Sequence, residues 1–207
     1  MKKKMSAKEK IKKASLKLFN ENDTLTITTN HIAKEAIISP GNLYYHYKDK
    51  EDIIKDIYLD MSCEFESFNS FELILSSENP LKVLSLMYDK YRELFFKYKF
   101  LVRDISTLLA IYHDIKMIFL QRQEKRILQI QSVLKYLIDL GIIDIPKDEI
   151  PLRAKLHWFI SSYWQIFTST SGDVTKESIK ETKYIVFKMQ LFPFLTVKGK
   201  ELIDFEL

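Results

Sequence analysis

Residues 27–54 read ITTNHIAKEAIISPGNLYYHYKDKEDII, and this stretch predicts two short helices joined by a tight turn, with a third helix starting just after. Thr28 and Thr29 supply hydroxyl groups that can cap the first helix, and Ser39 can cap the second. Pro40 follows at the first helical position, where the missing N–H of proline costs nothing. Two helices with so short a connection form a helix-turn-helix, whose second helix can lie in the major groove of DNA.

The second helix of this stretch has an apolar and a more polar face. Leu43 and Tyr47 lie four residues apart and are expected to face inward. Of Tyr44 and Tyr45 we expect one inward and one outward, because aromatic side chains also suit a small core. His46 is expected at the surface, with a core or capping position as the alternative.

These residues resemble the N-terminal domain of the tetracycline-repressor (TetR) family of bacterial transcription regulators. The resemblance covers about a quarter of the chain. It depends on the order and spacing of its residues, above all on the run Leu-Tyr-x-His-Tyr-x-x-Lys. The residues that carry it are Thr28, Thr29, Ile32, Ala33, Ala36, Ser39, Gly41, Leu43, Tyr44, His46, Tyr47 and Lys50.

One position departs from the family pattern. The family usually has glycine, or a residue that tolerates left-handed geometry, where this chain has Ile37. A β-branched residue at positive φ is strained. Either the turn has a different shape in this chain, or Ile37 stores backbone strain.

The resemblance implies a set of DNA-facing residues. Asn42 is suited to an adenine edge or to a phosphate, and Tyr45 can contact a thymine methyl group. Gly41 would let the backbone approach a phosphate, and Lys50 would hold a phosphate together with the start of the third helix. The whole set is Thr28, Thr29, Ser39, Pro40, Gly41, Asn42, Tyr44, Tyr45, His46 and Lys50.

Basic charge is concentrated in the first 50 residues. Residues 1–50 hold 11 lysines and 5 acidic residues, a net charge of +6, whereas the remainder of the chain carries −2. Basic charge attracts the phosphate backbone and makes binding salt-dependent, without specifying a sequence. A solvated lysine-rich face is the alternative reading. Because the charge coincides with the helix-turn-helix, we expect the lysine-rich outer face of the first helix to lie near DNA.

The composition favours an all-α protein. A chain of 207 residues can bury a sizeable core, and its few glycines and prolines fall at expected helix ends. We expect about nine helices, with a three-helix DNA-binding domain over residues 1–50 and a bundle for ligand binding and dimerisation over residues 51–207. A helix over residues 50–68 would join the two domains as a rigid rod. Residues 68–79 are expected as a loose connection, and residues 192–207 as an amphipathic tail.

The family resemblance implies that the second domain binds a small molecule inside its helical bundle. Arg103 could meet an anionic head group there, or could pair with Asp104 instead. The aromatic and aliphatic residues of this domain favour a hydrophobic or amphipathic effector, and ordinary core is the alternative role for each of them. The candidate pocket residues are Tyr88, Tyr91, Phe95, Arg103, Tyr112, Phe119, Trp158 and Phe159.

The resemblance also implies a homodimer formed by the last two long helices. A single helix-turn-helix reads too few bases to find a genomic site, so paired modules are needed. Apolar stripes on these helices could form either that interface or plain core. The candidate interface residues are Leu156, Tyr163, Phe167, Ile179, Val186 and Met189.

Several functional classes are disfavoured. The single Cys63 cannot form an internal disulfide, which suits the cytoplasm, and it is expected as buried apolar filler. The four histidines lack metal-ligand spacing, and no catalytic constellation, cofactor motif, signal peptide or membrane span is evident. We therefore interpret the chain as a non-enzymatic repressor that leaves operator DNA when a hydrophobic effector binds. The alternative is a helical lipid- or small-molecule-binding protein whose basic region contacts a membrane or another protein.

Overall fold

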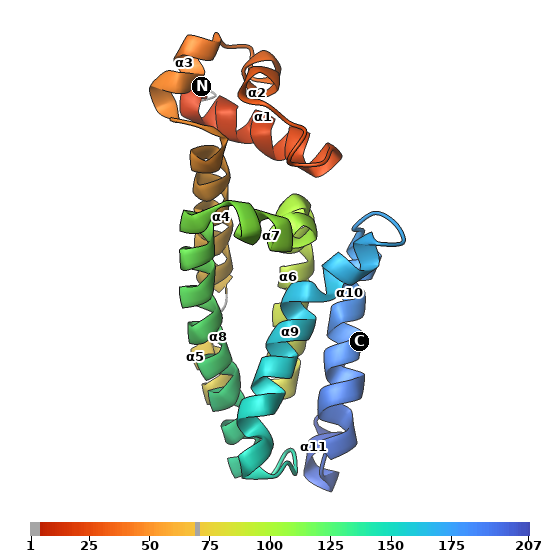
Figure 1. The fold of residues 1–207 in the computed structure, drawn as a ribbon. Coiled ribbons are helices and arrows are strands. Elements are labelled where there is room, and N and C mark those ends of the chain that lie inside the picture. The colour runs from red at the N-terminus through yellow and green to blue at the C-terminus, as the bar shows by residue number, and fades with distance from the viewer. Residues whose placement is uncertain (1–4, 69–70) are drawn as a thin grey trace.

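The computed structural model describes residues 5–68 and 71–207, which form eleven α-helices and no β-strand (Figure 1). The all-α prediction is confirmed. A π-helical turn, η2 (Val186–Leu191), continues α10, and short 3-10 helices lie at Lys147–Glu149 (η1) and Phe192–Phe194 (η3). The helices are α1 (Ala7–Glu21), α2 (Thr29–Glu35), α3 (Pro40–His46), α4 (Lys50–Phe68), α5 (Phe71–Ser76), α6 (Pro80–Lys97), α7 (Lys99–Ile111), α8 (His113–Asp139), α9 (Ile150–Ser169), α10 (Lys176–Ile185) and α11 (Val197–Glu201).

Two of these helices lie where the sequence predicted none. Helix α5 occupies part of the expected loose connection and buries Ile74 completely, while residues 69 and 70 of that connection lie outside the described residues. Helix α11 forms in the expected tail, where the Thr196 hydroxyl caps it and donates a 2.7 Å hydrogen bond to the carbonyl of Gly141. A Cβ added to Gly199 would come within 2.1 Å of the Ile142 carbonyl oxygen, so only glycine permits this close approach.

The first three helices form a small unit at one end of the molecule, and α4 leads away from it (Figure 1). In α1, Ser6 and Glu9 form a capping box, and the buried side chains Ile11 and Phe19 face the other two helices. The core does not stop at this unit, since the ring of Phe19 lies 5.1 Å from that of Phe100 on α7. The unit of α1, α2 and α3 and the bundle therefore share a continuous hydrophobic core.

Helices α4 and α8 are joined by ion pairs at both ends of their contact. Near the unit of the first three helices, Lys55 Nζ lies 2.7 Å from a carboxylate oxygen of Asp114. Further along, Glu66 pairs with Arg126 of α8. Helices α6, α9 and α10 complete the bundle (Figure 1), and a cavity lies between these helices.

Candidate DNA-binding surface and ligand cavity

Side-chain caps build the helix-turn-helix as the sequence predicts. The Thr28 hydroxyl accepts a hydrogen bond from the backbone N–H of His31, whose Nδ1 accepts the N–H of Thr28 in return. At α3, the Ser39 hydroxyl accepts the N–H of Asn42. Leu43 is completely buried beneath α3. These contacts fix the start of each helix.

Ile37 adopts left-handed backbone geometry in the turn, with φ of 55°. Its backbone N–H donates to the carbonyl of Lys34 at 3.1 Å, and the next N–H, from Ile38, donates to Ala33 at 3.0 Å. The Ile37 side chain is 88% exposed. The turn thus keeps the geometry for which glycine is suited, and Ile37 stores the strain.

Helix α3 presents its outer face to solvent. Tyr45 is 84% exposed and Tyr44 is 53% exposed, so the expectation of one inward tyrosine is wrong. Leu43 and Tyr47 already occupy the inner face at i, i+4 spacing, which leaves both intervening tyrosines outside. Tyr44 is nevertheless held in place, because its hydroxyl lies 2.9 Å from that of Thr29.

The other predicted DNA-facing residues gather on the same side. Ser39, Pro40, Gly41 and Asn42 are exposed at the start of α3, and a Cβ added to Gly41 would meet open space. His46 is half-buried, with its ring 5.1 Å from that of Tyr45. The first turn of α3 is therefore accessible from outside.

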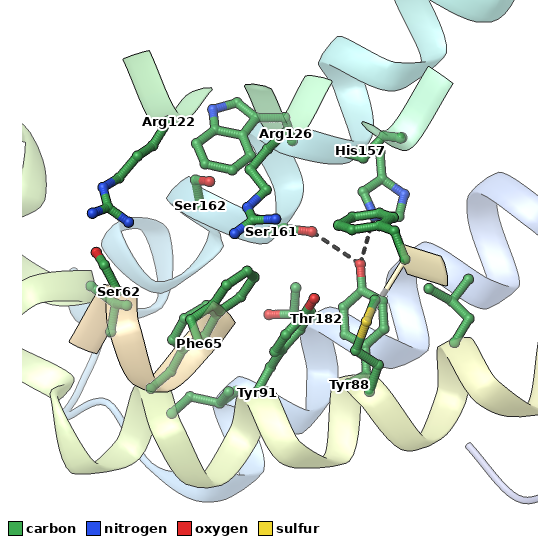
Figure 2. Close-up of a pocket in the computed structure, with 18 of the residues that line it drawn as sticks. Ser62, Phe65, Tyr88, Tyr91, Arg122, Arg126, His157, Ser161, Ser162 and Thr182 are labelled. Carbon is green, nitrogen blue, oxygen red and sulfur yellow. Dashed lines mark hydrogen bonds between the residues drawn. The ribbon is translucent and has the colours of Figure 1, made fainter. Parts of the chain in front are cut away.

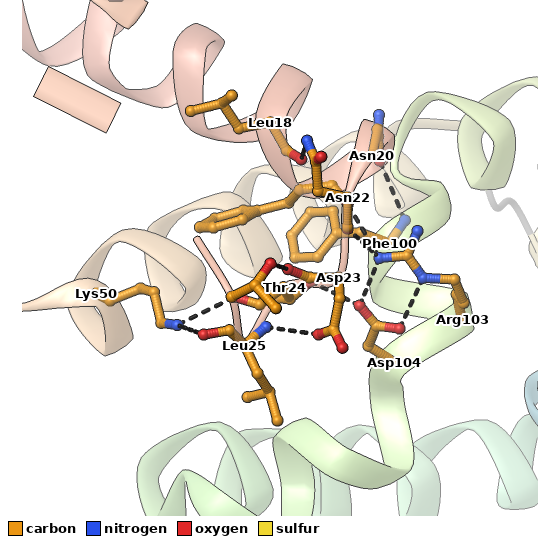
Figure 3. Close-up of polar contacts among 12 residues, drawn as sticks. Leu18, Asn20, Asn22, Asp23, Thr24, Leu25, Lys50, Phe100, Arg103 and Asp104 are labelled. Carbon is orange, nitrogen blue, oxygen red and sulfur yellow. Dashed lines mark hydrogen bonds and ion pairs between the residues drawn. The ribbon is translucent and has the colours of Figure 1, made fainter. Parts of the chain in front are cut away.

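Lys50 is a correction to the sequence-based prediction. Its Nζ donates hydrogen bonds to the backbone carbonyls of Thr24 at 3.0 Å, Leu25 at 3.2 Å and Ile27 at 3.0 Å. Burial lowers the pKa of this ammonium. Lys50 therefore orders the loop between α1 and α2 (Figure 3), and its ammonium group is already hydrogen-bonded within the protein. Sequence reasoning passed over Lys48, whose side chain is exposed just beyond α3.

Part of the basic charge of α1 is also neutralised within the protein. Lys8 and Lys12 both pair with Asp56 of α4, and Lys12 pairs with Asp60 as well. These two lysines consequently brace α1 against α4, which corrects the expectation that the whole lysine face of α1 lies near DNA. Lys13 is exposed on the same helix.

A mostly apolar cavity of about 170 Å³ lies inside the bundle, between α4, α6, α7, α8, α9 and α10 (Figure 2). An apolar cavity of about 150 Å³ can hold benzene, so this one has room for a small apolar group. Five of the predicted pocket residues line it: Tyr88, Tyr91, Phe95, Phe119 and Trp158.

Three predicted pocket residues do not line the cavity. Phe159 is 58% exposed on the outer face of α9, and Tyr112 precedes α8 at its junction with α7. Arg103 is absent from the cavity wall, and its guanidinium reaches the end of α1 (Figure 3). The sequence showed that these residues are aromatic or charged, but not which helix faces they occupy.

Arg103 pairs with Asp104, the alternative to a ligand contact, and this pairing raises the pKa of Arg103. The pair joins the bundle to the unit of the first three helices. The Arg103 guanidinium donates to the carbonyls of Phe19 at 3.0 Å and Asn22 at 2.7 Å. Asp104 accepts a 2.6 Å hydrogen bond from the hydroxyl of Thr24 (Figure 3).

The cavity also has polar side chains that sequence reasoning did not assign to it. The Tyr88 hydroxyl lies 2.8 Å from His157 Nε2 and 3.0 Å from the Ser161 hydroxyl (Figure 2). Burial lowers the pKa of His157 to about 4, so its imidazole is neutral near pH 7. Arg122 and Arg126 of α8 line the same cavity. No spacing pattern in the sequence marks these residues as neighbours.

The predicted dimer residues divide into exposed and buried sets. Leu156, Phe167 and Met189 are 47%, 64% and 64% exposed. Ile179 and Val186 are buried inside the protomer, because their face of α10 and η2 packs inward, so their assignment to the interface is wrong. Tyr163 is half-buried, and its ring stacks at 5.7 Å on that of Phe159. The exposed stripe also includes Leu152, Phe159 and Tyr184.

Three further features concern Cys63, metal sites and membrane spans. Cys63 is exposed, so the expectation of buried filler is wrong. Within residues 5–68 and 71–207, no cluster of histidine, cysteine or acidic side chains is arranged to hold a metal ion. Across the same residues, no helix is both long and apolar enough to cross a membrane.

Family models match both parts of the chain. Residues 11–57 match the model described as "Bacterial regulatory proteins, tetR family", and residues 68–203 match the one described as "Bacterial transcriptional repressor". The chain belongs to the TetR family. It is accordingly a helix-turn-helix, DNA-binding transcriptional regulator, as the sequence predicted.

Individual TetR-family and helix-turn-helix regulators agree with this assignment. The HTH-type transcriptional regulator SAS2464 of Staphylococcus aureus (strain MSSA476) is 26% identical over 179 residues, which cover 69% of this chain and 96% of that protein. The HTH-type transcriptional regulator YxbF of Bacillus subtilis (strain 168) is 43% identical over 56 residues. That match covers 27% of this chain but only 15% of YxbF.

Solved structures share the fold along nearly the whole chain. A TetR-family transcriptional regulator from Marinobacter aquaeolei VT8 has 27% sequence identity and a TM-score of 0.78, with 96% of each chain covered. SmeT, the repressor of the Stenotrophomonas maltophilia multidrug efflux pump SmeDEF, has 15% identity and a TM-score of 0.69. The match covers 94% of this chain and 93% of SmeT, and at that identity it shows the fold alone.

Proposed function

We propose that this TetR-family protein is a homodimeric repressor that leaves its operator when a small hydrophobic or amphipathic effector enters the bundle cavity. The DNA-binding domain comprises residues 1–50, and residues 51–207 form the effector-binding and dimerisation domain. The protein acts in the cytoplasm, where it meets operator DNA.

The observation that carries the proposal is the two-sided role of α7. Val102 and Ile105 line the cavity, while Arg103 and Asp104, which lie between them in sequence, hold the chain after α1. A ligand that displaces one face of this helix must therefore displace the contacts on the other. A short, densely bonded helix transmits such a movement with little loss, because packed interiors are not readily compressed.

Helix α4 offers a second connection between the cavity and the DNA-binding unit. Tyr58, Met61 and Phe65 of α4 line the cavity. The same helix begins at Lys50, which binds three carbonyls of the α1–α2 loop, and carries Asp56, which accepts a 2.6 Å hydrogen bond from the Tyr47 hydroxyl after α3. An effector that favours one position of α4 would thus favour one orientation of α3.

The exposed face of α3 is the proposed reading surface. Asn42 and Tyr45 would contact base edges in the major groove, and the open space at Gly41 would admit a phosphate close to the helix start. Lys48 would supply the phosphate contact first expected of Lys50. Thr28, Thr29, Ser39, Pro40, Tyr44 and His46 complete the surface.

Homodimerisation would bring two such surfaces to successive half-sites. The exposed apolar stripe of α9 is the proposed interface, with Leu156, Phe159 and Phe167 at its centre and Met189 of η2 beside it. Large apolar side chains gathered on one helical face mark a surface that is covered in the assembly.

The test uses a DNA fragment that the protein binds, taken from the region upstream of its own gene. Operator affinity is measured with and without small apolar compounds that bind the protein, for the natural chain and for Ser162→Trp, which places an indole in the cavity wall. The proposal expects such compounds to weaken operator binding by the natural chain, and Ser162→Trp to bind the operator but resist release. Compounds that occupy the cavity and leave operator affinity unchanged would contradict it.

A further inference from the structure

Beyond this proposed function, and resting on it, we propose that the effector is an amphipathic anion whose carboxylate head binds Arg122 while its apolar tail lies along the aromatic wall of the cavity. The sequence had offered Arg103 for an anionic head group. The structure commits Arg103 elsewhere and places two other arginines in the cavity wall.

The charge of the cavity wall is the first observation. Among the described residues that line the cavity, the charged side chains are Arg122 and Arg126, and none is an aspartate or glutamate. A ligand cation would meet two guanidinium groups with no carboxylate in the wall to offset them. A ligand anion would be attracted by the guanidinium groups and would meet no carboxylate in the wall. Arginine can bind a carboxylate through two parallel hydrogen bonds.

The two arginines differ in how far their charge is already satisfied. Arg126 is buried, pairs with Glu66, donates to Gln129 and stacks 4.4 Å from the ring centre of Phe65. Arg122 forms no ion pair with any described carboxylate, and its guanidinium lies 5.7 Å from the ring centre of Tyr58. The half-buried Arg122 is therefore the cation that a ligand can neutralise, and Arg126 is held in place beside it.

A second polar group in the cavity wall lacks a partner. Trp158 lines the cavity, and its indole Nε1 is buried without a hydrogen-bond acceptor among the described residues. A buried donor of this kind is destabilising unless something accepts its hydrogen bond. A carboxylate supplies acceptors and no donor, so it suits both Trp158 and Arg122.

A hydrogen-bonded cluster of three polar side chains makes one side of the cavity neutral. Tyr88, His157 and Ser161 satisfy one another, and His157 carries no charge near pH 7. Figure 2 shows this cluster on one side of the cavity and Arg122 on the other, with Arg126 and the ring of Phe65 between them. The cavity thus offers Arg122 as the arginine without an ion pair among the described residues, together with aromatic side chains and a neutral side, which matches one anionic head on an apolar chain.

The test compares three ligands with the same chain and different heads: octanoate, 1-octanol and octylammonium. Binding to the full-length protein is measured by calorimetry without DNA, for the natural chain and for Arg122→Gln. Lys135→Gln is the matched control, because it removes a positive charge from an exposed position on the same helix. We expect octanoate to bind the natural chain at least about tenfold more tightly than 1-octanol, and octylammonium more weakly than either.

In Arg122→Gln, octanoate should lose its advantage while the affinity for 1-octanol stays within about twofold, and Lys135→Gln should behave like the natural chain. Equal affinities for octanoate and 1-octanol in the natural chain would overturn the inference, as would an advantage that survives in Arg122→Gln. Since this readout contains no DNA, octanoate that binds through Arg122 without releasing the operator would uphold the inference and contradict the proposed function. Release of the operator by 1-octanol as effectively as by octanoate would uphold the proposed function and contradict the inference that the effector is an anion.

Discussion

The guanidinium of Arg103 on α7 donates a 2.7 Å hydrogen bond to the backbone carbonyl of Asn22, immediately after α1 (Figure 3). A charged side chain of the bundle is thereby attached to the main chain of the DNA-binding unit. The bond is reinforced by Asp104, which holds both the guanidinium and the Thr24 hydroxyl. Because the opposite face of α7 lines the cavity, this contact connects the cavity wall to the DNA-binding unit.

Replacing Arg103 with methionine should weaken this coupling more than it weakens DNA binding. The change leaves the carbonyls of Phe19 and Asn22 without their charged donor, so the free energy of unfolding should fall by about 1–3 kcal/mol. Operator affinity, measured with and without saturating effector, should respond less to the effector than in the natural chain. Lys99→Met, on the same helix, is the control. A full effector response in Arg103→Met would show that the movement travels by another route.

His157 should make stability depend on pH. Its pKa is about 4 in the folded protein and near the ordinary 6.5 in the unfolded chain. Above pH 6.5 both states are neutral, and as the pH falls from 6.5 to 4 only the unfolded chain takes up the proton. The free energy of unfolding therefore falls across that window by up to about 3 kcal/mol.

The measurement for His157 is urea unfolding between pH 7 and pH 4.5. Other groups titrate in this range, so the natural chain is compared with His157→Gln, which can still bond the Tyr88 hydroxyl but takes up no proton. The difference in stability between the two proteins should shrink or reverse toward low pH. A difference independent of pH would mean that the pKa of His157 is the same in the folded and the unfolded protein.

Lys48 and Lys50 form a matched pair with opposite expected effects. Lys48→Ala should leave stability within about 0.5 kcal/mol and reduce the salt slope of DNA binding by about one, because it removes a phosphate contact. Lys50→Ala should lower the free energy of unfolding by about 1–3 kcal/mol, because three carbonyls lose their donor, while the salt slope stays unchanged. The opposite assignment of the two effects would restore the phosphate role first expected for Lys50.

The exposed stripe of α9 should control the oligomeric state. Replacing Phe159 and Phe167 together with glutamate places two charges on surfaces that are 58% and 64% exposed in the protomer. Sedimentation should then show a folded monomer, and operator affinity should fall because half-sites are no longer read together. A double variant that remains dimeric would place the interface elsewhere.

Local signals in the sequence predicted the helix-turn-helix well. Ser39 and Pro40 mark the start of α3, and the spacing of Leu43 and Tyr47 identifies its buried face. These signals act within a few residues of each other, so a sequence contains them directly. At Ile37 the sequence left open a differently shaped turn or a strained one, and the φ of 55° shows the strained, left-handed turn.

Contacts between distant segments could not be predicted in this way. Lys50 was expected to bind phosphate, but the carbonyls that hold it lie more than twenty residues earlier in the chain. Arg103 lies in an apolar segment and Arg122 in a polar one, and only the packing of α7 and α8 decides which of the two lines the cavity. Ile179 and Val186 lie on one apolar face of their helix, which could serve as core or as dimer interface. Periodicity does not distinguish these two roles, and the structure shows that both side chains are buried inside the protomer.

The central claim is that the outer face of α3 enters the major groove, and operator binding by Tyr45→Ala tests it most directly. Because Tyr45 is 84% exposed, the variant should melt like the natural protein. We predict that its operator affinity falls by about tenfold or more, while its affinity for unrelated DNA stays within about threefold. A folded Tyr45→Ala protein that binds the operator as tightly as the natural chain would contradict the claim.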